Sequence, residues 1–484
     1  EWLDRGKPES LINLQRHKAF KNELPRVIRP DILLTEEGLK ITELDSVPGG
    51  IGLTAWLNRS YFEAGSNVIG GPTGMIDGFS GIFGNAEKIR MIVSDESATY
   101  RPEMEWIAEQ IGSDRCSVHN QDYINFKEGD ALYRFFELFD LENIPAAENI
   151  FQRAIEQKIN ITAPPNTFFA EIMTFWLFHT RKLSDAWSQQ LGDNFKNTLE
   201  SLLPQTWIID PEPIPPQAAY PGINLTDWNQ LKDLSQKERS LILKISGFSA
   251  QAWGARGVWL GSDLPRQEWA EAVDHAIDEY KESPRILQRY HHPIQVDSDW
   301  FNFESGKQQQ MQGRVRLCPY YYVHGEWDSA QTTLGGVLAT ICPSDKKIIH
   351  GMSDAILAPC ALKQTWSLDN QPYQAKSSRG MKNTFKCSTL LALTFLLAGC
   401  SGGKELRRLE TSYKVQLEEY AELYKAGEIT KVQHDKKVTL LNSRYGNRRA
   451  RMEREIYGET SIDDAVELIE EGINVEPLPG INPK

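Results

Sequence analysis

One stretch near the end of the chain, residues 381–400, most strongly limits how its 484 residues can fold. It opens with the short basic segment Met381–Lys386, continues with the apolar run Leu390–Ala398, and closes on small residues before Cys400. The apolar run is much shorter than the roughly 20 residues that cross a bilayer as a helix. A buried core helix is the alternative, but it does not ordinarily combine a basic start, an apolar middle and a small-residue end. We therefore expect no single domain to run across this stretch.

Residues 381–400 resemble a bacterial lipoprotein signal peptide, in which a final cysteine is acylated after cleavage. The matching string is Leu397-Ala398-Gly399-Cys400, and Ser401–Gly403 resembles the flexible tether that follows such a cysteine. Export signals act at the N-terminus of a nascent chain, whereas here 380 residues precede Met381. We expect that two neighbouring reading frames have been joined. A product beginning at Met381 would be anchored to the membrane through Cys400.

The chain therefore divides into four expected parts. Residues 1–362 form the main globular part, and we expect its N-terminus to be processed or truncated because the chain begins with Glu1. Residues 363–380 are polar and aperiodic, as in a linker or in the C-terminal tail of the preceding domain. Residues 381–400 are the signal-like segment. Residues 401–484 form a charged tail that we expect to be mostly helical, because leucines and tyrosines recur every three or four residues from 406 to 424 and a second helix is indicated over 429–457.

Strand-like and helix-like segments alternate through residues 1–362, which predicts an α/β (α+β) fold. Apolar, β-branched runs predict strands, and apolar residues at helical spacing predict helices. The expected strands are 89–93, 241–246, 258–260 and 286–290, and the expected helices are 104–111 and 267–280.

Charge excludes one class of partner. The chain has 66 acidic and 53 basic residues and a net charge of −13, so its field repels nucleic acid and anionic lipid. We expect no nucleic-acid partner, and membrane association only through the tail. The six cysteines lie far apart without CxxC or Cys/His spacing, so neither a disulfide scaffold nor a zinc site is indicated.

A cluster of acids lies in a predicted β-hairpin whose turn is at residues 36–38. Residues two apart on a strand face the same side, so Glu43 and Asp45 are expected to lie together, with Asp31 across the hairpin. We expect the three carboxylates to lack basic neighbours and therefore to require a cation, and oxygen ligands of this kind suit Mg²⁺ held against phosphate. Arg29 is placed to reach a phosphoryl oxygen. A surface hairpin with scattered acids is the alternative.

Two glycine-rich loops follow the hairpin, at residues 46–52 and 70–74. Neither matches a Walker or Rossmann fingerprint. We expect their glycines to allow the backbone to approach a ligand closely.

A second group of residues surrounds Lys244, which lies in the apolar strand 241–246. A lysine in such a strand is rarely buried unpaired, and a glycine-containing flap with an arginine follows it. Cationic groups in this arrangement suit the phosphates of a nucleotide, and strand 286–290 is expected to offer main-chain groups to an adenine edge. The other residues of this expected nucleotide site are Gly254, Arg256, Gly257, Gln288 and Tyr290.

In order and spacing, these segments resemble the circularly permuted branch of the ATP-grasp family, which includes glutathionylspermidine synthase. The likeness covers about residues 25–362. In that branch the metal-binding segment precedes the strand with the nucleotide lysine, as it does here, and the resemblance implies an ATP-grasp fold with a pre-ATP-grasp-like α/β layer. Further similar segments are Asp95-Glu96, Gly129–Phe136, Leu203–Trp207, Arg314–Pro319 and Gly335-Gly336.

The resemblance implies a cytoplasmic, ATP-dependent ligase that phosphorylates a small carboxylate and lets a small amine displace phosphate from the acyl phosphate. ATP and Mg²⁺ would be its cofactors, with Asp31, Glu43 and Asp45 on the metal. Arg29 would act as a catalytic group and Lys244 would bind the phosphates. No amidase domain is evident, so the two substrates cannot be carried over from glutathionylspermidine synthase.

Two positions depart from the family pattern. Asp45 stands where the family has an amide ligand, and residues 168–178 contain no lysine where the family tends to place a second nucleotide lysine. Lys196 is the candidate substitute. The missing lysine favours the alternative, a non-catalytic protein that binds a nucleotide or another ligand.

Overall fold

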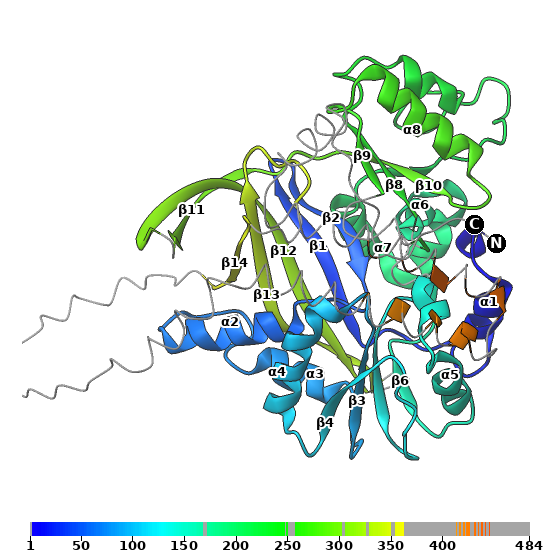
Figure 1. Cartoon of the computed structure of the whole chain (residues 1–484). Helices are drawn as coiled ribbons and strands as arrows, with labels where there is room; N and C mark the ends of the chain where they lie inside the picture. The colour runs from blue at the N-terminus through cyan, green and yellow to red at the C-terminus, as the bar shows by residue number, and fades with distance from the viewer. Residues whose placement is uncertain are drawn as a thin grey trace, which may run out of the picture. The chain divides into compact units, whose positions relative to one another are not determined.

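The structure, a computed structural model, describes residues 2–167, 172–246, 248–249, 257–302, 305–325, 329–349 and 354–362, and fifteen residues between 413 and 445. The chain divides into two compact units, residues 1–367 and 368–484. The first unit is a mixed α/β structure with three β-sheets (Figure 1), so the predicted fold class is confirmed. None of the helices in the described part of the chain has both the length and the apolar character needed to span a membrane.

The largest sheet contains the predicted hairpin. Its strands run in the order β14-β13-β12-β1-β2, and β11 pairs with β12 outside this path. Tyr320 and Tyr322 are buried two residues apart on β12, because alternate side chains of a strand face the same side. The strands are β1 (Val27–Thr35), β2 (Gly38–Asp45), β11 (Gln295–Asn302), β12 (Lys307–His324), β13 (Gln331–Pro343) and β14 (Ile356–Pro359).

A second, parallel sheet has the order β4-β3-β5-β6. Helix α4 connects β3 to β4, and α5 connects β5 to β6, so the two crossovers leave the middle of the sheet in opposite directions. In such sheets ligands bind beyond the carboxyl ends of the two central strands, here β3 and β5. The elements are β3 (Ile89–Val93), α4 (Arg101–Ile111), β4 (Cys116–Asn120), β5 (Ala131–Phe135), α5 (Ala147–Ile155) and β6 (Asn160–Thr162). The predicted strand at 89–93 and helix at 104–111 are confirmed.

The third sheet is antiparallel, with the order β7-β10-β8-β9. Helix α8 packs on it through Trp269, whose fully buried ring joins a cluster with Leu243 and Leu287. The elements are β7 (Thr206–Ile208), β8 (Leu241–Ile245), β9 (Val258–Leu260), α8 (Arg266–Asp278) and β10 (Arg285–Arg289). The predicted strands at 241–246, 258–260 and 286–290 and the helix at 267–280 are confirmed within one to two residues at each end.

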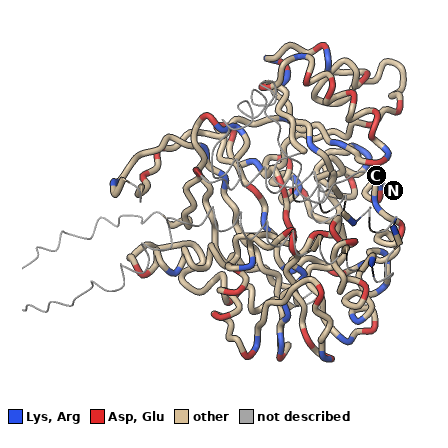
Figure 2. Tube along the Cα trace, in the orientation of Figure 1, with Lys and Arg blue, Asp and Glu red and all other residues tan. Residues whose placement is uncertain are grey.

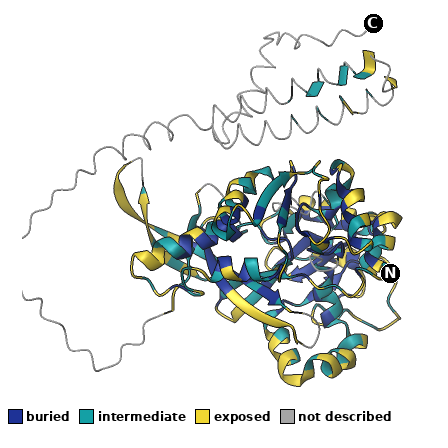
Figure 3. Ribbon diagram, turned by 90° about the horizontal axis from the view of Figure 1, so that it is seen from below, coloured by how far each residue is buried: buried dark blue, intermediate teal, exposed yellow. Residues whose placement is uncertain are grey.

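The main core lies between the six-stranded and parallel sheets, where α2 and α3 pack against β12 and β13. Figure 3 shows the buried residues concentrated along the sheets, with exposed residues on the outer helices. A smaller cluster joins β2 to two helices through Ile41, Phe175 and Leu203. The remaining α-helices have between seven and nineteen residues. They are α1 (Glu9–Arg16), α2 (Ile51–Glu63), α3 (Gly74–Gly81), α6 (Met173–His179) and α7 (Ser184–Leu202).

The two glycine-rich loops approach protein atoms closely. A Cβ on Gly49 would lie 2.3 Å from the Tyr100 ring, and one on Gly70 would lie 1.9 Å from the carbonyl oxygen of Gly335. Gly50 has φ +88°, which L side chains rarely adopt. The close approach at Gly49 and Gly70 is therefore to the protein's own chain, and the approach of a ligand to these loops stays a prediction.

Glu103 of α4 satisfies the start of α2. Its Oε1 accepts a hydrogen bond from the Gly50 N–H at 2.6 Å, and its Oε2 accepts one from the Leu53 N–H at 3.0 Å. A carboxylate at a helix N-terminus pairs otherwise free N–H groups and complements the helix dipole. Glu103 therefore takes the place at this helix end that an anionic ligand would otherwise use.

Replacing Glu103 with alanine is expected to lower the free energy of unfolding by about 1–2 kcal/mol, because two N–H groups at the start of α2 lose their acceptor. Urea denaturation followed by tryptophan fluorescence measures the change. Glu109, exposed on the same helix, provides the matched control, and Glu109→Ala should be nearly neutral. Equal effects of the two substitutions would contradict the capping role.

In the second unit, the described residues from 413 to 425 and from 431 to 445 are helical, as predicted for the tail. Tyr413 stacks on Tyr445 with ring centroids 4.1 Å apart, and the Tyr424 and His434 rings are 5.1 Å apart. Lys437 Nζ lies 5.0 Å from the centre of the Tyr420 ring. Early residues thus meet late ones, so the two helical stretches pack antiparallel. The signal-like segment 381–400 and Cys400 lie outside the described residues.

Candidate functional site

The predicted hairpin places its charged residues in two cross-strand pairs. Asp31 on β1 lies opposite Glu43 on β2, and Arg29 lies opposite Asp45. The pairing register shifts directly after Asp31. The predicted hairpin is therefore confirmed, with Asp31 opposite Glu43 as expected. Figure 2 shows basic and acidic positions of this unit close together where its sheets meet.

Asp31 is buried in an ion cluster. Its carboxylate accepts from Arg29 Nε at 3.1 Å and from Arg316 of β12 at 2.8 Å, and the Cys318 thiol lies 3.4 Å from Oδ1. Burial alone would raise the pKa of Asp31, but the charges of Arg29 and Arg316 outweigh it and lower that pKa. Asp31 is therefore ionised, and its carboxylate is paired with Arg29 and Arg316.

Arg29 is held between two acids. Its Nη2 lies 3.2 Å from Asp45 Oδ2, and its Nη1 donates to the Gly49 carbonyl oxygen at 3.3 Å. Burial opposes its charge, but Asp31 and Asp45 outweigh burial and raise the pKa of Arg29. The prediction that the carboxylates lack basic neighbours was wrong, because β12 brings Arg316 to Asp31 from far along the chain and Arg29 bends back onto its own hairpin.

Lys244 reaches the hairpin from the third sheet. The side chain is buried, and its Nζ donates to the Thr42 carbonyl oxygen at 3.0 Å and to Gln288 Oε1 at 3.1 Å. Gln288 in turn donates to Thr206 Oγ1 at 3.1 Å, which fixes its amide. Burial lowers the pKa of Lys244, against the effect of Glu43 and Asp31. The structure thus brings Lys244 and Gln288 together beside the acids.

The Glu43 side chain is exposed to solvent, although surrounding protein atoms partly desolvate its carboxyl group. This partial desolvation, with the charge of Asp31, raises the pKa of Glu43 to about 7, and nearby Lys244 acts in the opposite direction. In the described part of the chain, its carboxylate has no hydrogen-bond partner. Glu43 is thus the acid of the hairpin that is most available to a ligand.

Glu137 is a further acid near Asp45 and Glu43, and it was not predicted from the sequence as a site residue. It lies two residues after the last residue of β5, at the carboxyl end of a central strand of the parallel sheet. Burial, with the charge of Asp45, raises the pKa of Glu137 to about 7, although Arg134 opposes the shift. The available signal was its position after a fully buried strand beside the expected ligand-binding edge.

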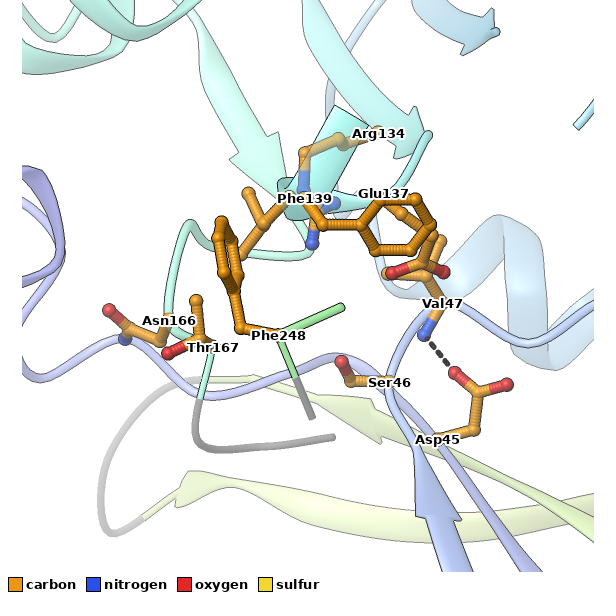
Figure 4. A pocket seen from close by; sticks show the side chains of 10 residues that line it. Asp45, Ser46, Val47, Arg134, Glu137, Phe139, Asn166, Thr167 and Phe248 are labelled. Atoms are coloured by element: carbon orange, nitrogen blue, oxygen red, sulfur yellow. Dashed lines mark hydrogen bonds between the residues drawn. The ribbon is translucent and has the colours of Figure 1, made fainter. Parts of the chain in front are cut away.

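Glu137 and Asp45 line one pocket together with residues from several loops. Figure 4 shows the two carboxylates on one side of it, and Asn166 and Thr167 on the other. The empty volume of the pocket, counted together with the open solvent at its mouth, is about 420 Å³. The lining residues are Asp45, Ser46, Val47, Arg134, Glu137, Leu138, Phe139, Asn166, Thr167 and Phe248.

The raised pKa of Glu137 predicts a pH-dependent stability. Because its folded-state pKa of about 7 lies above the ordinary 4.5, its stabilising effect is complete below the ordinary value and is lost as the pH rises through about 7. Glu137→Gln should therefore make the decline in unfolding free energy over this range shallower, on the order of 1 kcal/mol. Urea denaturation at a series of pH values measures this, with the exposed Glu142→Gln as control. A carboxyl ¹³C titration of Glu137 with an ordinary midpoint would contradict it.

The other predicted nucleotide residues are partly described. Gly254 and Arg256 lie outside the described residues, whereas Gly257 accepts from the Ile245 N–H through its carbonyl at 2.9 Å. Tyr290 donates its hydroxyl to the Lys347 carbonyl oxygen at 3.2 Å. Strand β10 is paired on both sides, and the Tyr290 N–H donates to Ser240. The main-chain groups of β10 expected to meet adenine are thus largely engaged within the sheet.

Two further predictions concern the metal ligands and Lys196, the candidate substitute for the second nucleotide lysine. Among the described residues, no three His, Cys, Asp or Glu side chains lie in a metal-holding group, because Asp31 and Asp45 face arginines. Lys196 lies on α7, where its Nζ donates to Ser184 Oγ at 2.7 Å and lies 3.7 Å from Glu200. Its partners are thus on its own helix.

Solved structures that are distantly similar to the chain include the following two. One is a glutathione synthetase-like effector from Globodera pallida in its apo form, at 12% identity over 73% of this chain and 80% of that chain, with a TM-score of 0.44. The other is a putative gamma-glutamylcysteine synthetase from Methylobacillus flagellatus, at 11% identity over 73% and 83%, with a TM-score of 0.37. No family model matches the chain. No curated protein matches it either.

Proposed function

We propose that residues 1–362 are a cytoplasmic ATP-dependent ligase that joins a small carboxylate to an amine through an acyl phosphate. The observation that carries this proposal is the contact of Lys244 with the main chain of β2, next to Glu43. The expected nucleotide lysine contacts the expected metal-binding hairpin across 202 positions of the chain. The circularly permuted ATP-grasp arrangement remains part of the proposal.

The donors present suit Mg²⁺ with phosphate. Mg²⁺ in nucleotide sites is commonly held by one or two carboxylates and the phosphate oxygens. Glu43 is exposed to solvent and has no hydrogen-bond partner among the described residues. The Asp45 side chain is 25% exposed, whereas that of Asp31 is 3% exposed. We therefore assign Glu43 and Asp45 to the metal, and Asp31 to orienting Arg29 and Arg316. When bound, Mg²⁺ would neutralise charge on the transferring phosphoryl group.

The basic side chains have separate roles. The Lys244 ammonium has three donors and uses two of them on Thr42 and Gln288, which leaves one for a phosphate oxygen. The guanidinium of Arg29 is fixed by its acids on either side, so its charge is preorganised toward phosphoryl oxygens. The Thr206–Gln288 hydrogen bond keeps the Gln288 oxygen turned to Lys244.

Calorimetric titration of the full chain with ATP tests the nucleotide site. We expect binding in the presence of Mg²⁺ and at least tenfold weaker binding with EDTA, which corresponds to about 1.4 kcal/mol. GTP serves as the control for the base. Binding that is equally strong in EDTA would contradict the assignment of Glu43 and Asp45.

A second candidate is a non-catalytic nucleotide-binding protein. The engagement of Lys196 by Ser184 and Glu200 favours it, because that lysine is then not offered to a nucleotide. Release of ADP in a screen of amines paired with carboxylates would support the ligase. ATP binding with no ADP release from any pair would support the second candidate.

We also propose that residues 381–484 belong to a separate lipoprotein anchored through Cys400. Acylation of Cys400 in a product starting at Met381 would support this. Detection of a single 55.0 kDa product in native cells would contradict it.

A further inference from the structure

The pocket between Asp45 and Glu137 contains a carboxylate that lacks a partner. Glu137 is partly buried, and its side chain makes no hydrogen bond or ion pair in the described part of the chain. The guanidinium of Arg134, whose charge favours the ionised form of Glu137, is itself buried, and it donates to the carbonyl oxygens of Ala163 and Phe136. A partly buried carboxylate without a donor is costly, so this pocket is short of one cationic donor.

The walls of the pocket are divided by polarity. Figure 4 shows the Phe139 ring beside the Glu137 carboxylate and the Phe248 ring nearer to Asn166 and Thr167. Asn166 is 3% exposed, and its Oδ1 has no hydrogen-bond partner in the described part of the chain. A ligand that suits these walls has an apolar stem and a positively charged donor at one end.

Asp45 connects the pocket to the proposed ligase site. One of its oxygens accepts from the Val47 N–H at 2.9 Å, and the other lies 3.2 Å from Arg29. A group bound beside Asp45 therefore lies next to the residues proposed to hold the phosphoryl group. The pocket is thus placed for the second substrate rather than for the nucleotide.

We propose that this pocket binds the amine substrate as a primary alkylammonium ion that carries no carboxylate next to its nitrogen. This inference rests on the proposed ligase function. The ammonium group donates to Glu137 and Asp45, and its alkyl stem lies between Phe139 and Phe248. An α-amino acid is excluded, because its carboxylate would face the two acids of the pocket.

Three small probes that share one straight alkyl chain test the proposal on the full chain by ligand-observed NMR titration. n-Butylammonium carries the charge alone, n-butanol lacks it, and L-norvaline adds a carboxylate beside the nitrogen. We expect n-butylammonium to bind at least tenfold more tightly than either of the others. Equal binding of n-butanol, or tighter binding of L-norvaline, would overturn the proposal.

Glu137→Gln is the decisive variant, because it keeps the shape of the side chain and removes the charge. We expect it to weaken n-butylammonium binding at least tenfold, while Glu142→Gln, exposed on the next turn of chain, leaves it unchanged. Unaltered binding by Glu137→Gln would overturn the proposal. ATP binding measured on the same samples separates the two claims: wild type that binds n-butylammonium but not ATP refutes the ligase and leaves the cation pocket standing.

Discussion

Replacing Asp31 with asparagine is expected to lower the free energy of unfolding by about 3–5 kcal/mol, as for other buried ion pairs that lose one partner. The substitution keeps the size of the side chain and removes its charge. The guanidinium groups of Arg29 and Arg316, with side chains 15% and 16% exposed, would then face each other without their shared acid. Denaturation in urea, followed by near-UV circular dichroism, measures the loss.

The control for this experiment is Asp299→Asn, an exposed acid on β11, which should change stability by less than about 0.5 kcal/mol. Because the pKa of Asp31 is lowered from its ordinary 3.8, the stabilisation is present above that value and is lost as the pH falls below it. The wild type and Asp31→Asn should therefore converge in stability in acid. A difference that persists there, or a loss of less than about 1 kcal/mol at neutral pH, would contradict the buried cluster.

Lys244→Met is expected to weaken Mg²⁺-dependent ATP binding roughly 10- to 100-fold, the loss that follows from removing a charged hydrogen bond of about 1.5–3 kcal/mol. Methionine fills the same buried space without the charge. The phosphate loses the third donor of the ammonium group, while Thr42 and Gln288 lose a partner each. Calorimetry on the full chain measures the affinity.

Lys232 provides the matched control. It lies in the same part of the chain, but its Nζ pairs with Asp274 at 2.6 Å, so Lys232→Met should bind ATP as the wild type does. Glu43→Gln should also weaken binding, and only while Mg²⁺ is present. If Lys244→Met binds ATP as tightly as Lys232→Met, the proposed nucleotide site is wrong.

Local patterns were sufficient to predict most of the elements around the site. The turn at residues 36–38 between two alternating segments predicted the hairpin, and the apolar run around Lys244 predicted a buried strand, because hydrophobic period and turn chemistry act over a few neighbouring residues. The same patterns predicted the helical tail, whose described residues confirm it.

Long-range partners could not be predicted in this way. Arg316 meets Asp31 across 285 positions of the chain, and nothing near either residue indicates the other. The glycines at 49 and 70 indicated a close approach, but whether to a ligand or to protein depended on where Tyr100 and Gly335 are placed by other elements. Glu137 had no recognisable motif at all.

The amino-acid sequence by itself determined which segments form strands and helices and that acids, an arginine and a strand lysine are available, because these follow from short-range periodicity. Only the tertiary structure decided how their charges are used. Sheet packing commits Asp31 to two arginines, leaves Glu43 and Glu137 without hydrogen-bond partners in the described chain, and brings Lys244 to β2. Burial and charge pairing depend on which distant strands meet, and that is set by the packing of the whole unit.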